Sequence, residues 1–336
     1  MAERAEHIAA FIAAAGWGDS TLAPLAGDAS FRRYVRLAAP RGTALLMDAP
    51  PPQEDVRPFL AVARLLRGMA LSAPRILAED IAAGLLLLED FGDDTYSRLL
   101  SRGAAEEPLY RLAVDVLIAL NRRFARESAA FLPPYDEARL LAEAALLVDW
   151  YLPAIAGAPT DPALRAGYLE LWRALLPLAR AVPETLVLRD YHVDNLMRLP
   201  GRDGIAACGL LDFQDAVLGP LSYDLVSLLE DARRDVPSGL AEAMYERFLA
   251  AFPALDRAAF ARSYALLGAQ RNCKIIGIFT RLCARDAKPA YLAHIPRVWR
   301  LLEQDLREPA LAPLAEWLDR HIPQAARRIP EPGLSQ

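Results

Sequence analysis

At 336 residues the chain is long for a single hydrophobic core, so a two-lobed enzyme or two modest domains is expected. Its composition is globular, with 54% hydrophobic and 24% charged residues, and no uninterrupted apolar run approaches the length of a membrane span. A formal net charge of −5 argues against nucleic acid as a partner, because such a partner calls for a basic face.

The first ninety residues combine helical and strand patterns. Residues 2–15 place apolar side chains on one helical face, and this pattern ends at Gly16. Charged residues as early as Glu3 and Arg4 are typical of neither a signal peptide nor a membrane anchor, so we expect a cytoplasmic protein. A second helical pattern covers residues 54–69. Strand patterns occur at residues 22–25, 31–37, 43–47, 74–78 and 84–88.

Beyond Thr95 the chain is almost wholly helical. Helical periodicity or length is found at residues 108–126, 137–151, 162–181, 220–231, 239–252, 257–285 and 289–306. A β-rich beginning followed by a helical remainder predicts an α+β protein of two lobes. We place the small lobe at residues 1–91, the large lobe at residues 92–328 and a frayed tail at residues 329–336.

The residues with catalytic potential concentrate in the stretch 186–225. Two apolar runs, 186–188 and 208–211, flank a turn-forming segment rich in Pro and Gly, so we expect them to pair as a β-hairpin. Such a hairpin would bring Asn195 and Asp212 to the same end.

The polar residues of this stretch have the spacing of a phosphoryl-transfer site. Asp190, four intervening residues and Asn195 reproduce the kinase catalytic loop, and Asp212 stands where a metal-binding Asp follows. One carboxylate would deprotonate the acceptor hydroxyl, while an amide and a second carboxylate would hold Mg²⁺. A competing register on Asp194 fails, because Leu199 occupies the position where its Asn would stand. Each residue alone is compatible with an ordinary turn, and it is the combination that indicates catalysis.

The small lobe lacks the lysine that pairs with the phosphates in protein kinases. The only lysines are Lys274 and Lys288, far downstream. The turn at residues 27–30 is small and polar, which suits passage over a phosphate. If ATP binds here, the positive charge must come from Arg32 or Arg33, or from magnesium alone.

The sequence resembles the aminoglycoside phosphotransferase superfamily, whose D-x-H-x-x-N signature is matched by Asp190, His192 and Asn195. More closely, it is similar to the anomeric N-acetylmuramate/N-acetylglucosamine kinases of bacterial cell-wall recycling. The stretches that carry this closer likeness are 27–34, 46–51, 86–90 and 270–279. The sequence departs from the superfamily at Leu188, where a His is usual, and at Met47, where the phosphate lysine is expected.

The resemblance implies a protein-kinase-like bilobal fold and ATP- and Mg²⁺-dependent phosphorylation of the C1 hydroxyl of N-acetylmuramate and N-acetylglucosamine in peptidoglycan recycling. It implies Asp190 as the base and Asn195 and Asp212 as the magnesium ligands. The candidate nucleotide-binding residues are Ser30, Phe31, Arg32 and Arg33, with Glu89 and Phe91 in the strand-to-helix turn where a kinase binds adenine.

Four residues are candidates for contact with the amino sugar. We expect His192 and Gln214 beside the base, and Arg271 and Lys274 offer positive charge to the lactyl carboxylate of N-acetylmuramate. The alternatives are a loop hydrogen bond for His192, a strand-end amide for Gln214 and solvated helix charges for the two cations. We expect Asp224 to brace the catalytic loop.

Two other functions stay open at this point. A kinase of the same fold could act on an aminoglycoside, a choline-like amine or an amino alcohol, for which an acidic acceptor pocket would be expected. The missing lysine and the missing His also suggest a nucleotide-binding pseudokinase, although the complete set of Asp190, Asn195 and Asp212 weighs against it. The sequence does not indicate an oligomeric state.

Overall fold

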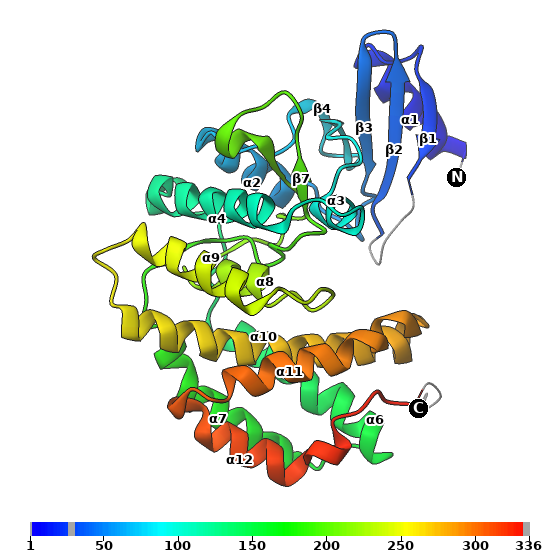
Figure 1. Cartoon of the computed structure of the whole chain (residues 1–336). Coiled ribbons are helices and arrows are strands. Elements are labelled where there is room, and N and C mark those ends of the chain that lie inside the picture. Colours follow the sequence, from blue (N-terminus) through cyan, green and yellow to red (C-terminus); the bar gives the residue numbers. More distant parts are fainter. Residues whose placement is uncertain (1, 26–30, 332–336) are drawn as a thin grey trace. The chain divides into compact units, whose positions relative to one another are not determined.

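The computed structural model describes residues 2–25 and 31–331 (Figure 1). Contacts divide the chain into two compact units. The first contains residues 1–131 and 193–216, and the second contains residues 132–192 and 217–336. We predicted a lobe boundary at residue 91 on functional grounds. The division into compact units does not test that boundary, so it stays a prediction.

The first unit carries a five-stranded antiparallel sheet in the order β1-β2-β3-β5-β4. Its strands are β1 (Thr21–Pro24), β2 (Arg33–Ala39), β3 (Gly42–Asp48), β4 (Ile76–Asp80) and β5 (Leu85–Glu89). A separate hairpin is formed by β7 (Leu196–Arg198) and β8 (Cys208–Leu210). The helices are α1 (Ala2–Ala14), α2 (Arg57–Gly68), α3 (Tyr96–Ser101), α4 (Glu106–Arg123) and the 3₁₀ helices η1 (Arg126–Ala129) and η3 (Gly204–Ala207). The strands expected in the first ninety residues are all present within two residues of their predicted ends.

Helix α1 covers one face of the sheet, as its apolar pattern predicted. Ile12 packs with Leu37 of β2 and Leu46 of β3 in a small buried cluster, and Ile8 and Phe11 pack against that cluster. The helix ends at Ala14, two residues before the predicted stop at Gly16, whose φ of +80° suits glycine.

The second unit is mainly helical. Its helices are α5 (Glu137–Ala144), α6 (Leu152–Ala156), α7 (Pro162–Ala179), α8 (Tyr223–Leu229), α9 (Ser238–Ala250), α10 (Arg257–Asp286), α11 (Ile295–Asp305) and α12 (Ala312–His321). Shorter segments are the π-helix η2 (Leu147–Tyr151) and the 3₁₀ helices η4 (Pro289–His294), η5 (Pro309–Leu311) and η6 (Gln324–Ala326). Two strands, β6 (Glu184–Val187) and β9 (Val217–Pro220), form an antiparallel pair. The α+β class is confirmed, with strands mainly early and helices mainly late in the chain.

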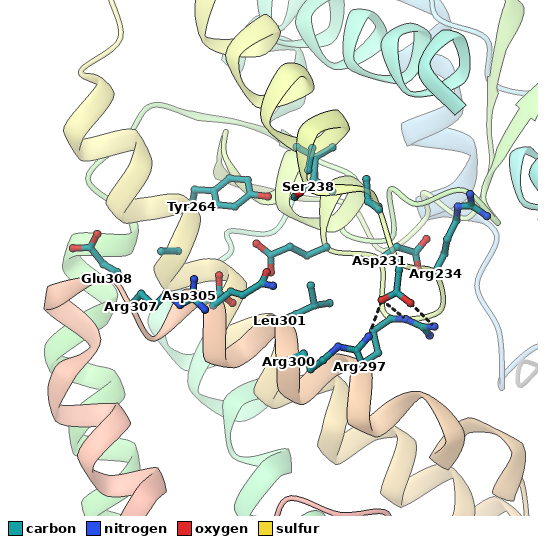
Figure 2. A pocket seen from close by; sticks show the side chains of 17 residues that line it. Asp231, Arg234, Ser238, Tyr264, Arg297, Arg300, Leu301, Asp305, Arg307 and Glu308 are labelled. Atoms are coloured by element: carbon teal, nitrogen blue, oxygen red, sulfur yellow. Dashed lines mark hydrogen bonds and ion pairs between the residues drawn. The ribbon is translucent and has the colours of Figure 1, made fainter. Parts of the chain in front are cut away.

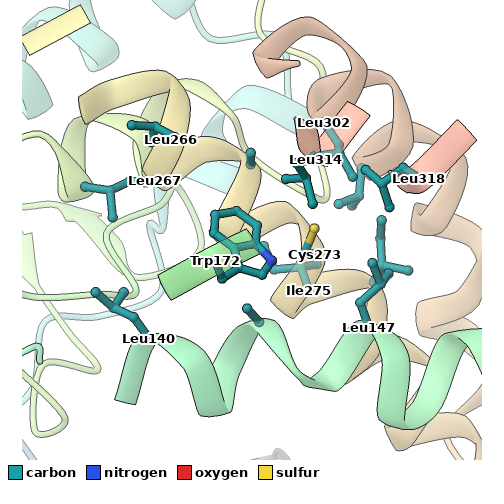
Figure 3. Packing of buried hydrophobic residues seen from close by; sticks show 14 of the residues in the cluster. Leu140, Leu147, Trp172, Leu266, Leu267, Cys273, Ile275, Leu302, Leu314 and Leu318 are labelled. Carbon is teal, nitrogen blue, oxygen red and sulfur yellow. The ribbon is translucent and has the colours of Figure 1, made fainter. Parts of the chain in front are cut away.

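Helix α10 is the centre of the second unit's core. Figure 3 shows Trp172 of α7 against side chains of α10, with Leu302 of α11 and Leu314 of α12 nearby. Gly277 lets α10 approach the chain just before η2, because a Cβ there would lie 2.3 Å from the backbone of Leu146. None of the described helices has the length and apolar character needed to cross a membrane.

The predicted pairing of the runs 186–188 and 208–211 is wrong. β8 pairs with β7, the nearest strand before the Pro- and Gly-containing turn, while β6 pairs with β9. β7 lies between β6 and β8 in the chain, and strands that follow one another in sequence pair more often than strands farther apart. The consequence drawn from the hairpin nevertheless holds, because Asn195 directly precedes β7 and Asp212 closely follows β8. The Leu211 N–H donates to the Asn195 carbonyl at 3.0 Å, which closes this end of the hairpin.

Candidate active site

A cavity of about 590 Å³ lies in the first unit. Its walls come from one face of the sheet, from the turn after β5 and from the open end of the β7–β8 hairpin. Tyr34 and Met47 contribute from the sheet, Phe91 from the turn, and Asn195 and Asp212 from the hairpin. A cavity of this size suits a small-molecule cofactor or a nucleotide.

Asn195 and Asp212 come together as predicted. The Asn195 amide Nδ2 donates to Asp212 Oδ2 at 3.4 Å, and Gln214 Nε2 donates to Asp212 Oδ1 at 2.8 Å. Asp212 has a φ of +56°, which is uncommon for a residue other than glycine and is often found at functional sites. Next to it, the Phe213 ring is buried and stacks on Phe59 of α2 at 4.9 Å, which anchors this segment.

The donor set of this pair fits magnesium, which favours carboxylate and amide oxygens and keeps several ligands from water and phosphate. Asp215 also lines the cavity and adds a third nearby oxygen donor. No cluster of three or more His, Cys, Asp or Glu side chains suited to a metal occurs in the described parts of the chain. Asn195 and Asp212 would each supply an oxygen ligand, and magnesium usually takes its other ligands from water and phosphate.

The turn after β5 forms one end of the cavity. Glu89 and Phe91 both line it, and their contact with adenine stays a prediction. The Arg202 guanidinium pairs with Glu89 at 2.5 Å and lies 5.4 Å from the centre of the Phe91 ring. On β8, a Cβ on Gly209 would lie 2.8 Å from that ring, so glycine leaves room for Phe91.

The four candidate nucleotide-binding residues at positions 30–33 separate into three groups. Ser30 lies outside the described residues. Phe31 is 68% exposed and Arg33 is exposed, and neither is among the described residues that line the cavity. Arg32 does line the cavity, and its Nε lies 2.9 Å from the Glu54 carboxylate. The helical pattern that begins at Glu54 did not indicate a role for this carboxylate.

Asp190 lies in the second unit, on a loop that follows β6. Its N–H donates to the Leu188 carbonyl at 2.9 Å, and its own carbonyl accepts from the His192 N–H at 3.2 Å. The Asp224 carboxylate accepts from the N–H groups of Leu188 and Arg189 at 2.7 and 2.9 Å. The predicted brace is therefore confirmed.

Arg189, the neighbour of Asp190, is held in a strained conformation. Its φ of +70° is in the left-handed region, which a long side chain rarely adopts. The Ser227 hydroxyl donates to its carbonyl at 3.2 Å, and its guanidinium pairs with the Glu143 carboxylate. Contacts to its N–H, its carbonyl and its side chain thus fix the backbone next to Asp190.

Glu143 is the centre of a buried polar network that sequence reasoning missed. Besides Arg189, its carboxylate accepts from the Tyr135 hydroxyl at 2.5 Å and from Gln270 Nε2 at 3.4 Å. The Lys274 ammonium lies 3.1 Å away. Burial acts most strongly and raises the pKa of Glu143, but Lys274 and Arg189 outweigh it, so the pKa is lowered. The signal in the sequence was the polar run at residues 270–274 within a helix otherwise rich in apolar residues.

Arg271 and Lys274 of α10 are not solvated helix charges, and that alternative is wrong for both. Arg271 is 4% exposed and donates to the Glu230 carbonyl at 3.1 Å. Lys274 is 9% exposed and pairs with Glu143. Both lie in the interior because α10 packs against other elements on most of its sides.

His192 and Gln214 have different surroundings. Gln214 lines the cavity of the first unit and donates to Asp212. His192 belongs to the second unit and is buried. Burial is the main cause of the lowered pKa of His192; Asp231 and Asp190 oppose it, whereas Arg233 and Arg271 add to it. His192 is therefore neutral at neutral pH.

A second cavity, of about 550 Å³, lies in the second unit where α10 and α11 approach the segment between α8 and α9 (Figure 2). Arg297 and Arg300 of α11 both pair with Asp235 at 2.9 Å. Asp231 lines the same cavity and acts on the pKa of His192, so this cavity and the catalytic loop share a neighbour.

Two buried carboxyl groups, Glu230 and Asp305, also line the second cavity. The Asn272 amide donates to both, at 3.0 and 2.9 Å. Burial raises the pKa of Glu230 to about 7 and that of Asp305 well above its usual range. The pair therefore retains a proton to a higher pH than free carboxylic acids do.

The fold and the amide–carboxylate pair at the cavity of the first unit fit a phosphotransferase. The chain belongs to the family described as "Phosphotransferase enzyme family", whose sequence model matches residues 21–261.

Full-length relatives support this assignment. The chain is 40% identical to the N-acetylmuramate/N-acetylglucosamine kinase of Caulobacter vibrioides, over 97% of this chain and 99% of that protein. It is 41% identical to the kinase of the same name from Pseudomonas aeruginosa, over 93% of each chain. Its fold is similar to that of the GDP complex of wild-type aminoglycoside 2'-phosphotransferase-IIIa, with a TM-score of 0.60, 16% identity and coverage of 89% of this chain and 97% of that one.

Proposed function

We propose that the chain is a cytoplasmic, ATP- and magnesium-dependent kinase that phosphorylates the C1 hydroxyl of N-acetylmuramate and N-acetylglucosamine in peptidoglycan recycling. The observation that carries this acceptor is the near full-length similarity to the two kinases named for these sugars. The pairing of Asn195 with Asp212 at the cavity supports phosphoryl transfer.

In the proposed reaction, Asp190 accepts the proton of the C1 hydroxyl. The C1 oxygen forms a bond to the γ-phosphorus of ATP while the bond from that phosphorus to the bridging oxygen breaks, releasing ADP. An anomeric hydroxyl is more acidic than an ordinary alcohol, so an ordinary carboxylate suffices as base. A positioned base of this kind contributes ~10²–10⁴-fold in rate.

The remaining residues bind and orient the reactants. Asn195 and Asp212 would hold magnesium, which when bound neutralises phosphate charge. Phe91 would contact the adenine within the cavity of the first unit. We propose His192 as a neutral hydrogen-bonding partner of the sugar near Asp190, whereas the engagement of Gln214 with Asp212 favours a role at the nucleotide.

The direct test is product analysis after incubation of the purified protein with ATP, Mg²⁺ and each sugar. Phosphorus NMR should detect an acid-labile sugar 1-phosphate from N-acetylmuramate and from N-acetylglucosamine. The matched control is the methyl glycoside of N-acetylglucosamine, which is blocked at C1 and should give no product.

Three results would contradict the proposal. Phosphorylation of the blocked glycoside would show that another hydroxyl reacts. Phosphorylation of an aminoglycoside, choline or an amino alcohol, but of neither amino sugar, would establish the alternative acceptor class. Binding of ATP without transfer to any acceptor would indicate a pseudokinase.

A further inference from the structure

The sheet register shows where a phosphate-binding cation can stand when β3 carries no lysine. Met47 of β3 lies directly across from Tyr34 of β2 in the antiparallel ladder. Directly opposed residues share a face of the sheet, and residues two apart on one strand share a face as well. Arg32 stands directly before the first residue of β2, two residues before Tyr34. All three line the cavity.

Arg32 is largely buried at the cavity wall and is held there by an ion pair. Its side chain is 17% exposed and that of Glu54 is 14% exposed, and their 2.9 Å contact fixes the guanidinium at the cavity wall. Burial acts most strongly and lowers the pKa of Arg32, but Glu54, Tyr34 and Asp212 outweigh it, so the pKa is raised. Arg32 and Asp212 both line the cavity, so this cation and a proposed magnesium ligand face the same space.

The other arginines that line the cavity have different roles. Among the described lining residues these are Arg36 and Arg98. Arg36 lies 2.7 Å from Asp90 and 3.0 Å from Asp93, so it braces the turn after β5. Arg98 is 57% exposed and lies 3.4 Å from Asp93. Arg33 points to the opposite face of β2, away from Tyr34.

We infer that Arg32, anchored by Glu54, is the phosphate-binding cation of this chain and takes the place of the lysine that protein kinases carry on β3. The inference rests on the proposed function for the identity of the nucleotide. It assigns Glu54 as a positioning residue, since this carboxylate acts through Arg32.

The test compares two ligands that differ in their phosphates. Calorimetric affinities for ATP with Mg²⁺ and for adenosine are measured on the wild type and on Arg32→Met. We expect the Kd for ATP to rise at least about tenfold, because a charge-assisted contact is lost, and the Kd for adenosine to stay unchanged. Arg33→Met is the matched control and should leave both affinities unchanged.

A lysine introduced at position 47 tests whether a positive charge at the usual kinase position can replace Arg32. Met47→Lys in the Arg32→Met background should recover at least about tenfold of the lost kcat/KM for ATP, since one lost electrostatic donor typically costs about 10²-fold or more. Arg32→Lys keeps a positive charge and should retain part of the activity. Glu54→Gln should lower kcat more than it raises the KM for ATP, because the guanidinium is then present but poorly oriented.

Two outcomes would overturn the inference. One is an Arg32→Met affinity for ATP equal to that of the wild type. The other is a folded Arg32→Met protein in which ATP and adenosine binding weaken equally, because that would show a general effect on the cavity. Both measurements need no acceptor, so they stay informative if neither amino sugar is phosphorylated and the proposed function fails.

Discussion

The buried carboxylate of Asp224 holds the backbone that leads to Asp190, the proposed base. It accepts the two N–H groups that precede Asp190. Burial is the largest influence and raises the pKa of Asp224, the two N–H groups lower it, and the charge of Asp190 raises it; the net pKa is about 7. The ionised form accepts both hydrogen bonds, so protonation as the pH falls through about 7 loosens the loop.

We therefore expect kcat of the wild type to fall as the pH is lowered through about 7. In Asp224→Asn this dependence should disappear, and kcat should be lower by about 10²-fold at pH 8, the size of effect expected for a misplaced catalytic group. Steady-state kinetics between pH 5.5 and 8.5 measure both effects, and ATP affinity serves as the control. An Asp224→Asn enzyme with wild-type kcat would contradict the role of the brace.

Lys274 shows how burial changes the interpretation of a charged residue. Its ammonium lies 3.1 Å from Glu143, the carboxylate that also holds Arg189. Replacing Lys274 by Met removes one of two cations from a buried carboxylate. We expect a lower melting temperature, with a stability loss below the ~3–5 kcal/mol of a fully broken buried pair, because Arg189 remains.

The KM values of Lys274→Met for the two amino sugars distinguish a structural role of Lys274 from a sugar-binding role. If it serves Glu143, Lys274→Met should change KM for N-acetylmuramate and for N-acetylglucosamine by the same factor. A selective rise in KM for N-acetylmuramate, the sugar with the lactyl carboxylate, would instead support the predicted contact of Lys274 with the substrate.

At the scale of elements, the close approach of α10 to the segment before η2 depends on Gly277. A Cβ there would meet the Leu146 backbone at 2.3 Å, and backbone cannot move aside as a flexible side chain can. Gly277→Ala should therefore destabilise the protein by about 1–3 kcal/mol through overpacking.

The matched control for this element is Gly167→Ala. Gly167 lies within α7, and its added Cβ would meet nothing within 4 Å. This change should raise stability by up to ~1 kcal/mol, because alanine favours a helix more than glycine does. Chemical denaturation of the two variants measures the contrast. Equal effects of both changes would refute the close-packing account.

At the scale of the whole molecule, the cavity and Asp190 belong to different compact units. ATP with Mg²⁺ should therefore raise the melting temperature of Asp190→Asn as much as that of the wild type, since ligand binding stabilises by about 2.7 kcal/mol at a hundred times Kd. Asp212→Asn should lose the magnesium-dependent part of this shift. Thermal scans with and without Mg²⁺ test the assignment, and an Asp190→Asn protein that no longer responds to ATP would contradict it.

Local patterns predicted much of this architecture, and long-range packing accounts for what they missed. The contact between Asn195 and Asp212 depends on a short hairpin, so it could be predicted from the sequence. The β6–β9 pair joins strands thirty residues apart, and no local pattern distinguished that partner from β8. Likewise, helical periodicity does not show that α10 is covered on most sides, so the burial of Lys274 became evident only in the structure.

The most direct measurement is the rate of phosphoryl transfer by Asp190→Asn at saturating ATP, Mg²⁺ and N-acetylmuramate. Asparagine keeps the size of the side chain but accepts no proton, so kcat should fall by ~10²–10⁴-fold while the Kd for ATP stays at the wild-type value. A variant that transfers phosphate within threefold of the wild-type rate would contradict the assignment of Asp190 as the base.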